Sequence, residues 1–233
     1  MLILLNIGNT HTQIGFVDQL GNIVKIKGVP TSDFSASMLP PNCDIAAATV
    51  VPEIKNVLAD RKVFWIREAD KFNVNFDLVD FNTLGSDRIA NAATLAAIGL
   101  LPGLCVDCGT AVTYELIDHN AVFQGGAIAP GRRLMSQALS DHTAQLPMID
   151  LAGNILTKAG HNTIEAITVG IETQLIGGVK EFIRLARKQL GCSIKVVVVG
   201  GDSQIILDNI DGLEYGSDDF TLRGIMTLWE LNN

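Results

Sequence analysis

The chain has 233 residues, of which 48% are apolar, and this content allows a large buried core and argues against a disordered chain. Its formal charge of −8 at pH 7 opposes attraction to nucleic acid or to anionic lipid, because both bind cationic surfaces. The composition therefore favours a soluble enzyme with neither nucleic acid nor membrane as a partner.

The first residues predict a β-hairpin. Met1 to Leu5 is apolar but short and has no basic flank, so it is typical of a strand and not of a signal peptide. It leads into the turn-forming sequence Asn6-Ile7-Gly8-Asn9-Thr10, and His11 to Val17 resumes strand-like alternation. No other segment approaches the ~20 apolar residues that span a bilayer, so we expect a cytoplasmic protein.

The rest of the first half, residues 1–101, mixes strands and helices. Three short segments have the composition of strands: Asn22 to Val29, Ile45 to Val51 and Val63 to Ile66. Pro52 to Arg61 has apolar residues at helical spacing. Ser86 to Leu100 predicts a second helix, whose Ser-Asp opening can accept hydrogen bonds from the free amides of the first turn.

The strand-turn-strand pattern returns in residues 102–233. Leu104 to Val106 predicts a buried strand, Cys108 to Thr110 a turn, and Ala111 to Ile117 a second strand. An offset of 107 − 6 = 101 residues matches three pairs: Asn6 with Asp107, Gly8 with Gly109 and Thr12 with Thr113. Because residues and context recur together, we interpret the halves 1–101 and 102–233 as a duplication, with chance similarity as the alternative.

The remaining segments of the second half predict one more strand and several helices. They are a strand-to-helix transition at Gly125-Gly126 and Pro130-Gly131, one long helix or two joined near Gly177-Gly178 within Asn162 to Leu190, a strand from Ile194 to Val199, and a terminal helix from Asp219 to Leu231.

Two of the four cysteines, Cys105 and Cys108, form a C-x-x-C pair, which is a pattern of redox and zinc sites. Residues three apart in a strand point to opposite faces, so the two sulfurs would not readily share one ion. We therefore favour a structural role and keep metal or redox use as the alternative. The four histidines lack metal-ligand spacing, and we interpret them as structural or solvated.

Three turns after strands can bring the backbone close to a charged ligand. In the first, Gly8 allows a sharp turn while Asn9 and Thr10 supply donors for a phosphate, although a plain hairpin uses the same residues. In the second, the Asp107 carboxylate can bind a cation and the Thr110 hydroxyl can reach a phosphate. The third, Gly200-Gly201-Asp202, is equally typical of a tight βα connection.

Six motifs, in order along nearly the whole chain, resemble those of the type III pantothenate kinases. They are Asn6-Ile7-Gly8-Asn9-Thr10 after a strand, Gly85-Ser86-Asp87-Arg88, Asp107-x-Gly109-Thr110-x-x-Thr113, Gly125-Gly126-x-Ile128-x-Pro130-Gly131, Thr143-x-x-Leu146-Pro147 and Gly200-Gly201-Asp202. The resemblance implies an α/β fold of the actin/sugar-kinase/Hsp70 superfamily, with two similar ribonuclease-H-like halves and an interdomain nucleotide cleft.

The same resemblance implies roles for individual residues. ATP binding is implied for Asn6, Ile7, Gly8, Asn9, Thr10, His11, Thr12, Gln13 and Thr110, and pantothenate binding for Gly85, Ser86, Asp87, Arg88 and Thr163. Asp87 matches the proposed catalytic base, and Asp107 matches a ligand of a monovalent cation, K⁺ or NH₄⁺. The implied reaction is the ATP- and Mg²⁺-dependent phosphorylation of pantothenate to 4'-phosphopantothenate, the first step of coenzyme A biosynthesis, in a homodimer.

The position of Asp87 at a helix start bears on its chemistry. A helix N-terminus stabilises a carboxylate, so we expect a lowered pKa and a weak base. A weak base suffices where phosphoryl transfer depends on alignment and charge neutralisation. The alternative for Asp87 and Arg88 is a helix cap beside a surface ion pair.

Two departures from the family pattern leave other functions open. Asn6 stands where the family normally has an aspartate, which lowers the expected metal affinity, and Leu78 and Phe81 lie near the usual tyrosine and proline. One alternative is therefore a catalytically weakened homologue that acts as a regulatory or accessory binding protein. Another is a kinase for a different small hydroxylated substrate, because a fold does not fix function.

Overall fold

The structure of the protein, a computed structural model, describes residues 1–151 and 158–233. Contacts divide the chain into two compact units. Unit 1 contains Met1–Gly103, Glu115–Gly125 and Gly216–Asn233, and unit 2 contains Leu104–Tyr114 and Gly126–Tyr215. The division of the sequence into residues 1–101 and 102–233 stays a prediction.

The first sheet has five strands, all in unit 1. They are β1 (Leu2–Ile7), β2 (His11–Val17), β3 (Ile23–Pro30), β4 (Asp44–Thr49) and β5 (Val63–Trp65), in the order β3-β2-β1-β4-β5. β1 runs antiparallel to β2, with Asn6 opposite Gln13, and parallel to β4. The predicted hairpin and strands are confirmed.

Both faces of the first sheet are covered. On one face Ile3, Leu5 and Ile7 of β1 belong to a buried apolar cluster that includes Phe34. On the other face a side chain at Gly15 would stand 3.0 Å from Leu222 of α6 (Phe220–Asn232), which therefore packs closely on the sheet. This two-sided burial explains why β1 is almost continuously apolar.

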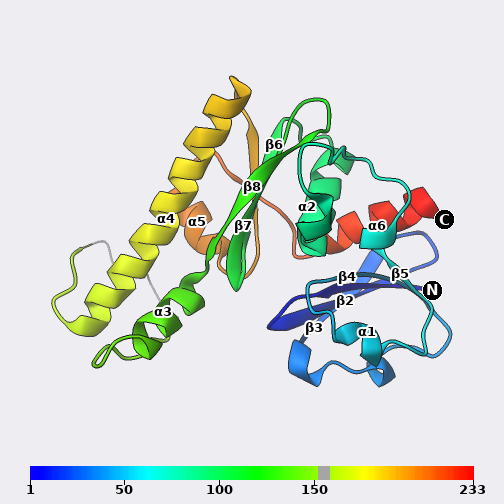
Figure 1. Ribbon diagram of the computed structural model, residues 1–233, viewed down its shortest axis with the longest axis horizontal. Coiled ribbons are helices and arrows are strands. Elements are labelled where there is room, and N and C mark those ends of the chain that lie inside the picture. Colours follow the sequence, from blue (N-terminus) through cyan, green and yellow to red (C-terminus); the bar gives the residue numbers. More distant parts are fainter. Residues whose placement is uncertain (152–157) are drawn as a thin grey trace. The chain divides into compact units, whose positions relative to one another are not determined.

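Helix α2 (Ser86–Ala97) packs on α6 within unit 1, as Figure 1 shows. The two helices approach so closely that a Cβ on Gly224 would stand 1.9 Å from the carbonyl oxygen of Ala90. Thr94 Oγ1 donates a 2.7 Å hydrogen bond to the Phe220 carbonyl, and Thr221 Oγ1 donates a 2.8 Å bond to Asn91 Oδ1. Buried polar bonds thus fix how α2 lies on α6.

The remaining helical elements of unit 1 are short. They are α1 (Ile54–Val57) and four 3₁₀ turns at Thr31–Asp33, Ala36–Met38, Ile66–Glu68 and Phe81–Thr83. The predicted helix over Pro52 to Arg61 is therefore reduced to a single turn. Its cap, Glu53, makes no side-chain capping hydrogen bond, so the turn lacks a signal that would extend it.

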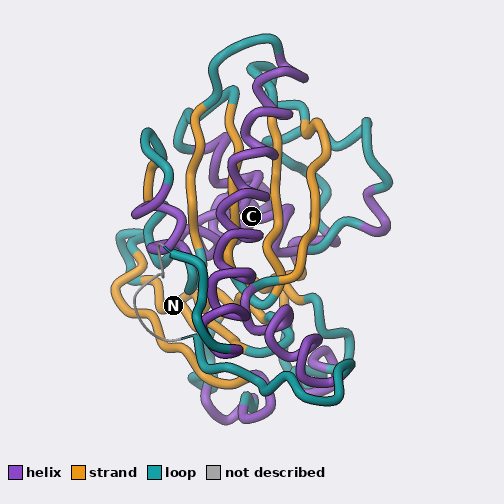
Figure 2. The backbone as a smooth tube through the Cα atoms, turned by 90° about the vertical axis from the view of Figure 1, so that its left-hand side faces the viewer, coloured by secondary structure: helices purple, strands orange, loops and turns teal. Residues whose placement is uncertain are grey.

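The second sheet repeats the strand order of the first. It contains β6 (Gly103–Cys108), β7 (Ala111–Ile117), β8 (Phe123–Pro130), β9 (Lys195–Val199) and β10 (Glu214–Tyr215), in the order β8-β7-β6-β9-β10. Each strand number is five higher than its counterpart in the first sheet. This match supports the predicted duplication and confirms two mixed-sheet α/β halves; Figure 2 shows their strands and helices along the backbone.

The two hairpins differ in the length of their turns. Gly8 N–H donates to the His11 carbonyl (3.0 Å), whereas Gly109 N–H donates to the Ala111 carbonyl (3.1 Å). After the turn the offset is therefore 111 − 11 = 100 residues, and buried Thr12 corresponds to buried Val112. The predicted match of Thr12 with Thr113 is wrong, because the second turn is one residue shorter.

Unit 2 contains three helices in its described part: α3 (Arg132–Asp141), α4 (Thr163–Leu190) and α5 (Ser203–Asn209). α4 is one helix of 28 residues, with Gly177 and Gly178 inside it (Figure 1). Asn162 Oδ1 accepts from Glu165 N–H at its start, and Gly191 ends it in the left-handed conformation. None of the helices within the described ranges is both long and apolar enough to cross a membrane.

Candidate active site

The β1–β2 turn in unit 1 is held by Thr31. Thr31 Oγ1 donates a 2.7 Å hydrogen bond to the Gly8 carbonyl, and Thr31 N–H donates to the Thr10 carbonyl at 2.9 Å. Thr12 Oγ1 lies 3.0 Å from Thr31 Oγ1, and Thr12 is the donor because Thr31 already donates to Gly8. The turn therefore has a fixed shape before any ligand binds.

The residues predicted to bind ATP differ in accessibility within this turn. Asn9 and His11 are exposed, while Asn6, Gly8, Thr10 and Gln13 are half-buried. Ile7 and Thr12 are buried, so their side chains support the turn from inside. The groups of this segment that a ligand can reach are thus the side chains of its exposed and half-buried members, because the Gly8 N–H and carbonyl are both bonded within the turn.

The predicted substrate motif begins helix α2. Ser86 Oγ donates a 3.0 Å hydrogen bond to the carbonyl of Thr49, the last residue of β4. Gly85 caps the helix, and a Cβ there would stand 2.5 Å from Asp87 Oδ1. The first turn of α2 is therefore tied to the end of β4, and a side chain at position 85 would displace the Asp87 carboxylate.

The pKa of Asp87 is raised from its ordinary value of 3.8, chiefly because burial removes water from the carboxylate. The Arg88 N–H, 2.8 Å from Asp87 Oδ1, and the Arg88 charge oppose this pKa rise without overcoming it. The expected lowering of the Asp87 pKa is thus wrong, because desolvation outweighs the helix-start amide. A raised pKa makes Asp87 a better proton acceptor than its sequence position predicts.

Arg88 forms a buried ion pair. Its Nε lies 2.9 Å from Glu115 Oε1, and the Glu115 side chain is fully buried in β7. The guanidinium carbon also lies 5.8 Å from the centre of the Phe123 ring. The alternative of a surface ion pair is therefore wrong, because this pair fixes the Arg88 side chain inside unit 1.

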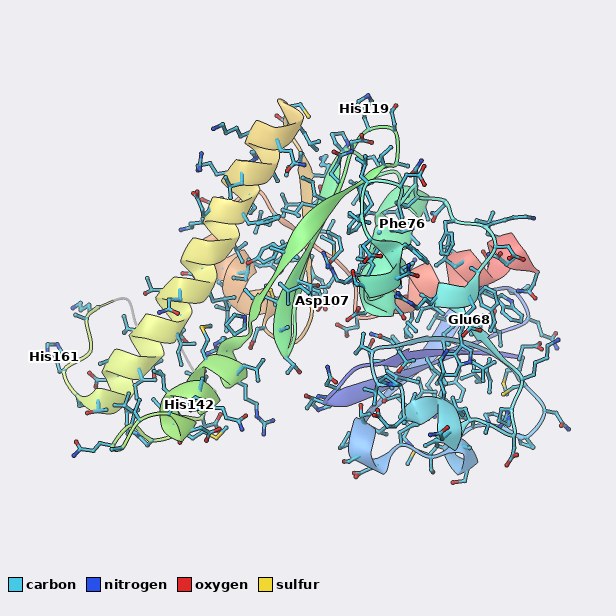
Figure 3. The ribbon with its side chains drawn as sticks, in the orientation of Figure 1. Glu68, Phe76, Asp107, His119, His142 and His161 are labelled. Carbon is cyan, nitrogen blue, oxygen red and sulfur yellow. The ribbon has the colours of Figure 1, made fainter. Side chains whose placement is uncertain are left out.

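In unit 2, the β6–β7 turn lies against two glycines. Gly131 N–H donates a 3.0 Å hydrogen bond to the Thr110 carbonyl, and a Cβ on Gly131 would stand 2.3 Å from the Gly109 carbonyl oxygen. Gly200, with φ +90°, has no room for a side chain either, since its Cβ would lie 2.7 Å from Asp107 Oδ1. Asp107 and Thr110 are therefore held by backbone packed directly against them; Figure 3 labels Asp107.

The C-x-x-C pair lies in β6 with both sulfurs buried. Burial, together with the nearby Asp107 and Asp202 carboxylates, raises the pKa of the Cys108 thiol to about 12. Within residues 1–151 and 158–233, no group of three or more His, Cys, Asp or Glu side chains could hold a metal ion. His119, His142 and His161, labelled in Figure 3, are exposed.

Comparison with known proteins identifies the family. The sequence profile of the type III pantothenate kinases matches residues 2–185. The chain belongs to the type III pantothenate kinase family. It is 31% identical to the type III pantothenate kinase of Agathobacter rectalis, covering 100% of this chain and 98% of the relative. It is 29% identical to that of Methylacidiphilum infernorum, covering 99% and 88% respectively.

Solved structures confirm the fold of this pantothenate kinase family member. A Baf family transcriptional activator described as putative, from Campylobacter jejuni, has a TM-score of 0.71 at 21% identity and covers 99% of this chain and 98% of its own. The activator of 2-hydroxyisocaproyl-CoA dehydratase from Clostridium difficile, with bound ADPNP, has a TM-score of 0.55 at 15% identity, covering 98% and 93%. Both likenesses cover nearly the whole chain and confirm the predicted α/β fold with two mixed-sheet halves.

The segment that departs from the pantothenate kinase pattern lies beside an aromatic cavity in unit 1. Leu78 is 65% exposed, so it is open to solvent rather than part of the core. The Phe81 ring lies 5.3 Å from that of Phe72 and 5.5 Å from that of Phe76. These three rings line a cavity of about 740 Å³. This chain therefore packs an aromatic cluster at the segment where the sequence predicted a departure from the family pattern.

Two residues that support the kinase motifs were missed by sequence reasoning. Thr31 carries no sequence signal, because it is an ordinary polar residue after a strand. Glu115 does carry one, since it is a single carboxylate within the apolar strand Ala111–Ile117 and such a group needs a buried partner. Thr163, predicted from the resemblance, is exposed and is the first residue of α4.

Proposed function

We propose that this chain transfers the γ-phosphoryl group of ATP to the primary hydroxyl of pantothenate and so makes 4'-phosphopantothenate and ADP, the first step of coenzyme A biosynthesis. The observation that carries the proposal is the partly desolvated Asp87 carboxylate at the start of α2, inside the family match over residues 2–185. A carboxylate with a raised pKa is suited to accept the proton of the attacking hydroxyl.

Asp87 and its neighbours supply the substrate side of this proposal. Ser86 and Gly85 hold the first turn of α2, and Glu115 holds Arg88, so the motif is organised before pantothenate binds. Asp87 accepts the hydroxyl proton, and Arg88, held by its ion pair with Glu115, is assigned to substrate binding beside it. Thr163 is proposed as a further pantothenate contact.

The nucleotide side rests on the two turns. Gly8 keeps the turn free of a side chain at that position, and Asn9 and Thr10 add polar groups beside it, which suits binding to phosphate oxygens. Mg²⁺ bound with ATP would neutralise charge on the phosphates. Asp107 and Thr110 in unit 2 are assigned to the monovalent cation and to ATP.

Asp107 fits a monovalent cation, K⁺ or NH₄⁺. Its carboxylate is half-buried and pressed against Gly200, and the Cys108 carbonyl lies against the same glycine. Carboxylate and carbonyl oxygens are the ligands of hard cations. We further propose that the protein is cytoplasmic and forms a homodimer. Sedimentation of the purified protein would test the homodimer.

A coupled kinase assay tests the proposed function. The purified protein with ATP, Mg²⁺ and K⁺ should make ADP only when pantothenate is present. A panel of other small hydroxylated acceptors distinguishes pantothenate from a different substrate. Folded protein that makes no ADP with pantothenate under these conditions would contradict the proposal.

Asn6→Asp tests the weakened-homologue alternative. Asn6 lies opposite Gln13 in the β1–β2 hairpin and offers only neutral groups to the ATP-bound Mg²⁺. We expect aspartate to raise kcat/KM for ATP by about tenfold, because a carboxylate binds a hard cation more strongly than an amide does.

The size of the Asn6→Asp effect separates the two functions. A native enzyme with turnover near 1 s⁻¹ or faster, in the ordinary range for kinases, supports a working kinase. A native protein that binds ATP but turns over only after Asn6→Asp supports the regulatory homologue. Asn42→Asp, which adds the same charge at an exposed position elsewhere in unit 1, is the matched control.

A further inference from the structure

Arg132 is a buried arginine that joins three separate segments of unit 2. It is the first residue of α3, and its side chain is only 7% exposed. Nη1 lies 3.0 Å from Asp202 Oδ1, and Nη2 lies 2.9 Å from Glu172 Oε1 in α4 and 2.6 Å from the Leu151 carbonyl. The partners at positions 202, 172 and 151 lie far from Arg132 along the chain.

These contacts complete a ring of bonds around the β6–β7 turn. On one side, Gly131, the residue before Arg132, donates its N–H to the Thr110 carbonyl at 3.0 Å. On the other side, Asp202 donates its N–H to the Cys108 carbonyl at 3.1 Å. The ion pair between Arg132 and Asp202 closes the ring. This ion pair therefore sets the distance between the two backbone hydrogen bonds that hold the turn.

The state of the cluster argues against a purely stabilising role. Arg132 Nε and Glu172 Oε2 are buried and have no hydrogen-bond partner in the described part of the chain. A cluster kept for stability would have its buried polar atoms paired, and a buried ion triad is often replaceable by apolar residues without loss of stability. The Asp202 side chain, in contrast, is 30% exposed and borders a cavity of about 620 Å³.

We propose that Arg132 is a positioning residue for the β6–β7 turn and acts through Asp202. This inference rests on the proposed function, because it takes Asp107 and Thr110 as the cation and ATP residues. Arg132 holds Asp202 so that the Gly200–Asp202 turn stays against the end of β6, where a Cβ on Gly200 would lie only 2.7 Å from Asp107 Oδ1. Asp202 in turn fixes the backbone that precedes Thr110.

The test separates stability from nucleotide affinity. Arg132→Met alone leaves Glu172 buried and unpaired, so this variant should be destabilised. The double variant Arg132→Met/Glu172→Met removes both deeply buried charges, and its unfolding midpoint should return close to the native value. Its Kd and KM for ATP should nevertheless stay about 10-fold to 100-fold above native, because the turn is misplaced. KM for pantothenate should stay within about twofold, since the substrate motif at α2 is unchanged.

Arg184→Met removes an exposed ion pair with Glu181 in α4 and should change neither measurement. A double variant with native ATP affinity, or with pantothenate KM raised by the same factor as ATP KM, overturns the inference. Should neither methionine variant fold, Arg132→Lys decides, because lysine keeps the charge but cannot hold Asp202 and Glu172 in one planar fork.

The two proposals can fail separately. Calorimetric titration with ATP in the absence of pantothenate measures the effect of Arg132 even if pantothenate is not the acceptor. Native ATP binding that Arg132→Lys and the double variant leave unchanged contradicts the positioning role alone. Absence of pantothenate-dependent ADP formation, with ATP binding still dependent on Arg132, contradicts the proposed function alone.

Discussion

Asp87→Asn should lower kcat for pantothenate phosphorylation by about 100-fold or more, because it removes the proton acceptor for the attacking hydroxyl. ATP affinity should change little, since Asp87 is assigned to the substrate and not to the nucleotide. Steady-state kinetics with both substrates varied measure this separation. Asp60→Asn, which changes an exposed carboxylate elsewhere in unit 1, is the matched control.

The same variant should be more stable than the native protein at neutral pH. Burial holds the folded-state pKa of Asp87 above 3.8, so its stabilising contribution is complete below the unfolded pKa and is lost as pH rises through the folded pKa. Above the folded-state pKa the carboxylate carries a poorly hydrated charge, and asparagine removes that charge while keeping an acceptor for Arg88 N–H. A lower unfolding midpoint for Asp87→Asn would contradict this account.

The acid side of the pH profile follows from the same pKa. A general base must be deprotonated, so kcat/KM for pantothenate should fall as pH decreases through the raised Asp87 pKa, above 3.8. Two results would show that proton abstraction by Asp87 is not used. One is a kcat of Asp87→Asn equal to the native value, and the other is a decrease of kcat/KM only at or below the ordinary carboxylate pKa.

Gly224→Ala should destabilise the protein by about 3 kcal/mol or more, because overpacking against backbone has no cheap relaxation. The new Cβ would stand 1.9 Å from the Ala90 carbonyl oxygen and 2.7 Å from Thr94 Oγ1. Moving α6 away from α2 would also strain the bonds from Thr94 to Phe220 and from Thr221 to Asn91. Equilibrium unfolding in urea measures the change.

Gly177→Ala in α4 is the matched control for Gly224→Ala. An added Cβ at Gly177 meets no atom within 4 Å, and the residue lies inside a continuous helix. We expect it to stabilise α4 by about 0.5–1 kcal/mol, since alanine loses less conformational entropy than glycine on helix formation. Equal destabilisation by both substitutions would mean that the contact of α2 with α6 at Gly224 does not decide the result.

Local pattern predicted most of the fold. The β1–β2 hairpin and its recurrence as β6 and β7 follow from apolar strands separated by glycine-containing turns, and the structure adds the matching order of all ten strands. The pairing of distant strands such as β1 with β4 depends on contacts that no local pattern encodes. The predicted match of Thr12 with Thr113 was wrong because it assumed two turns of equal length. The second turn is one residue shorter, and the sequence match alone does not reveal this difference.

The candidate site was less predictable than the fold. Asp87 was found from its motif, but its pKa direction was not, since the burial of a helix start is set by tertiary packing. Arg88 and Glu115 are 27 residues apart, and Arg132 and Asp202 are 70 apart, so each ion pair needs the three-dimensional fold to be seen. Residues predicted through the resemblance, including Thr163, stay predictions until the kinase assays are done.

The buried Cys108 thiol at the end of β6 allows local opening of the protein to be measured by alkylation. With a pKa of about 12, Cys108 is almost entirely protonated at neutral pH, and the thiol is far less nucleophilic than the thiolate. Cys192, in contrast, is exposed. Iodoacetamide should therefore label Cys192 early and label Cys108 only when the β6–β7 hairpin opens transiently. The delay between the two adducts in mass spectra then measures how often this hairpin opens.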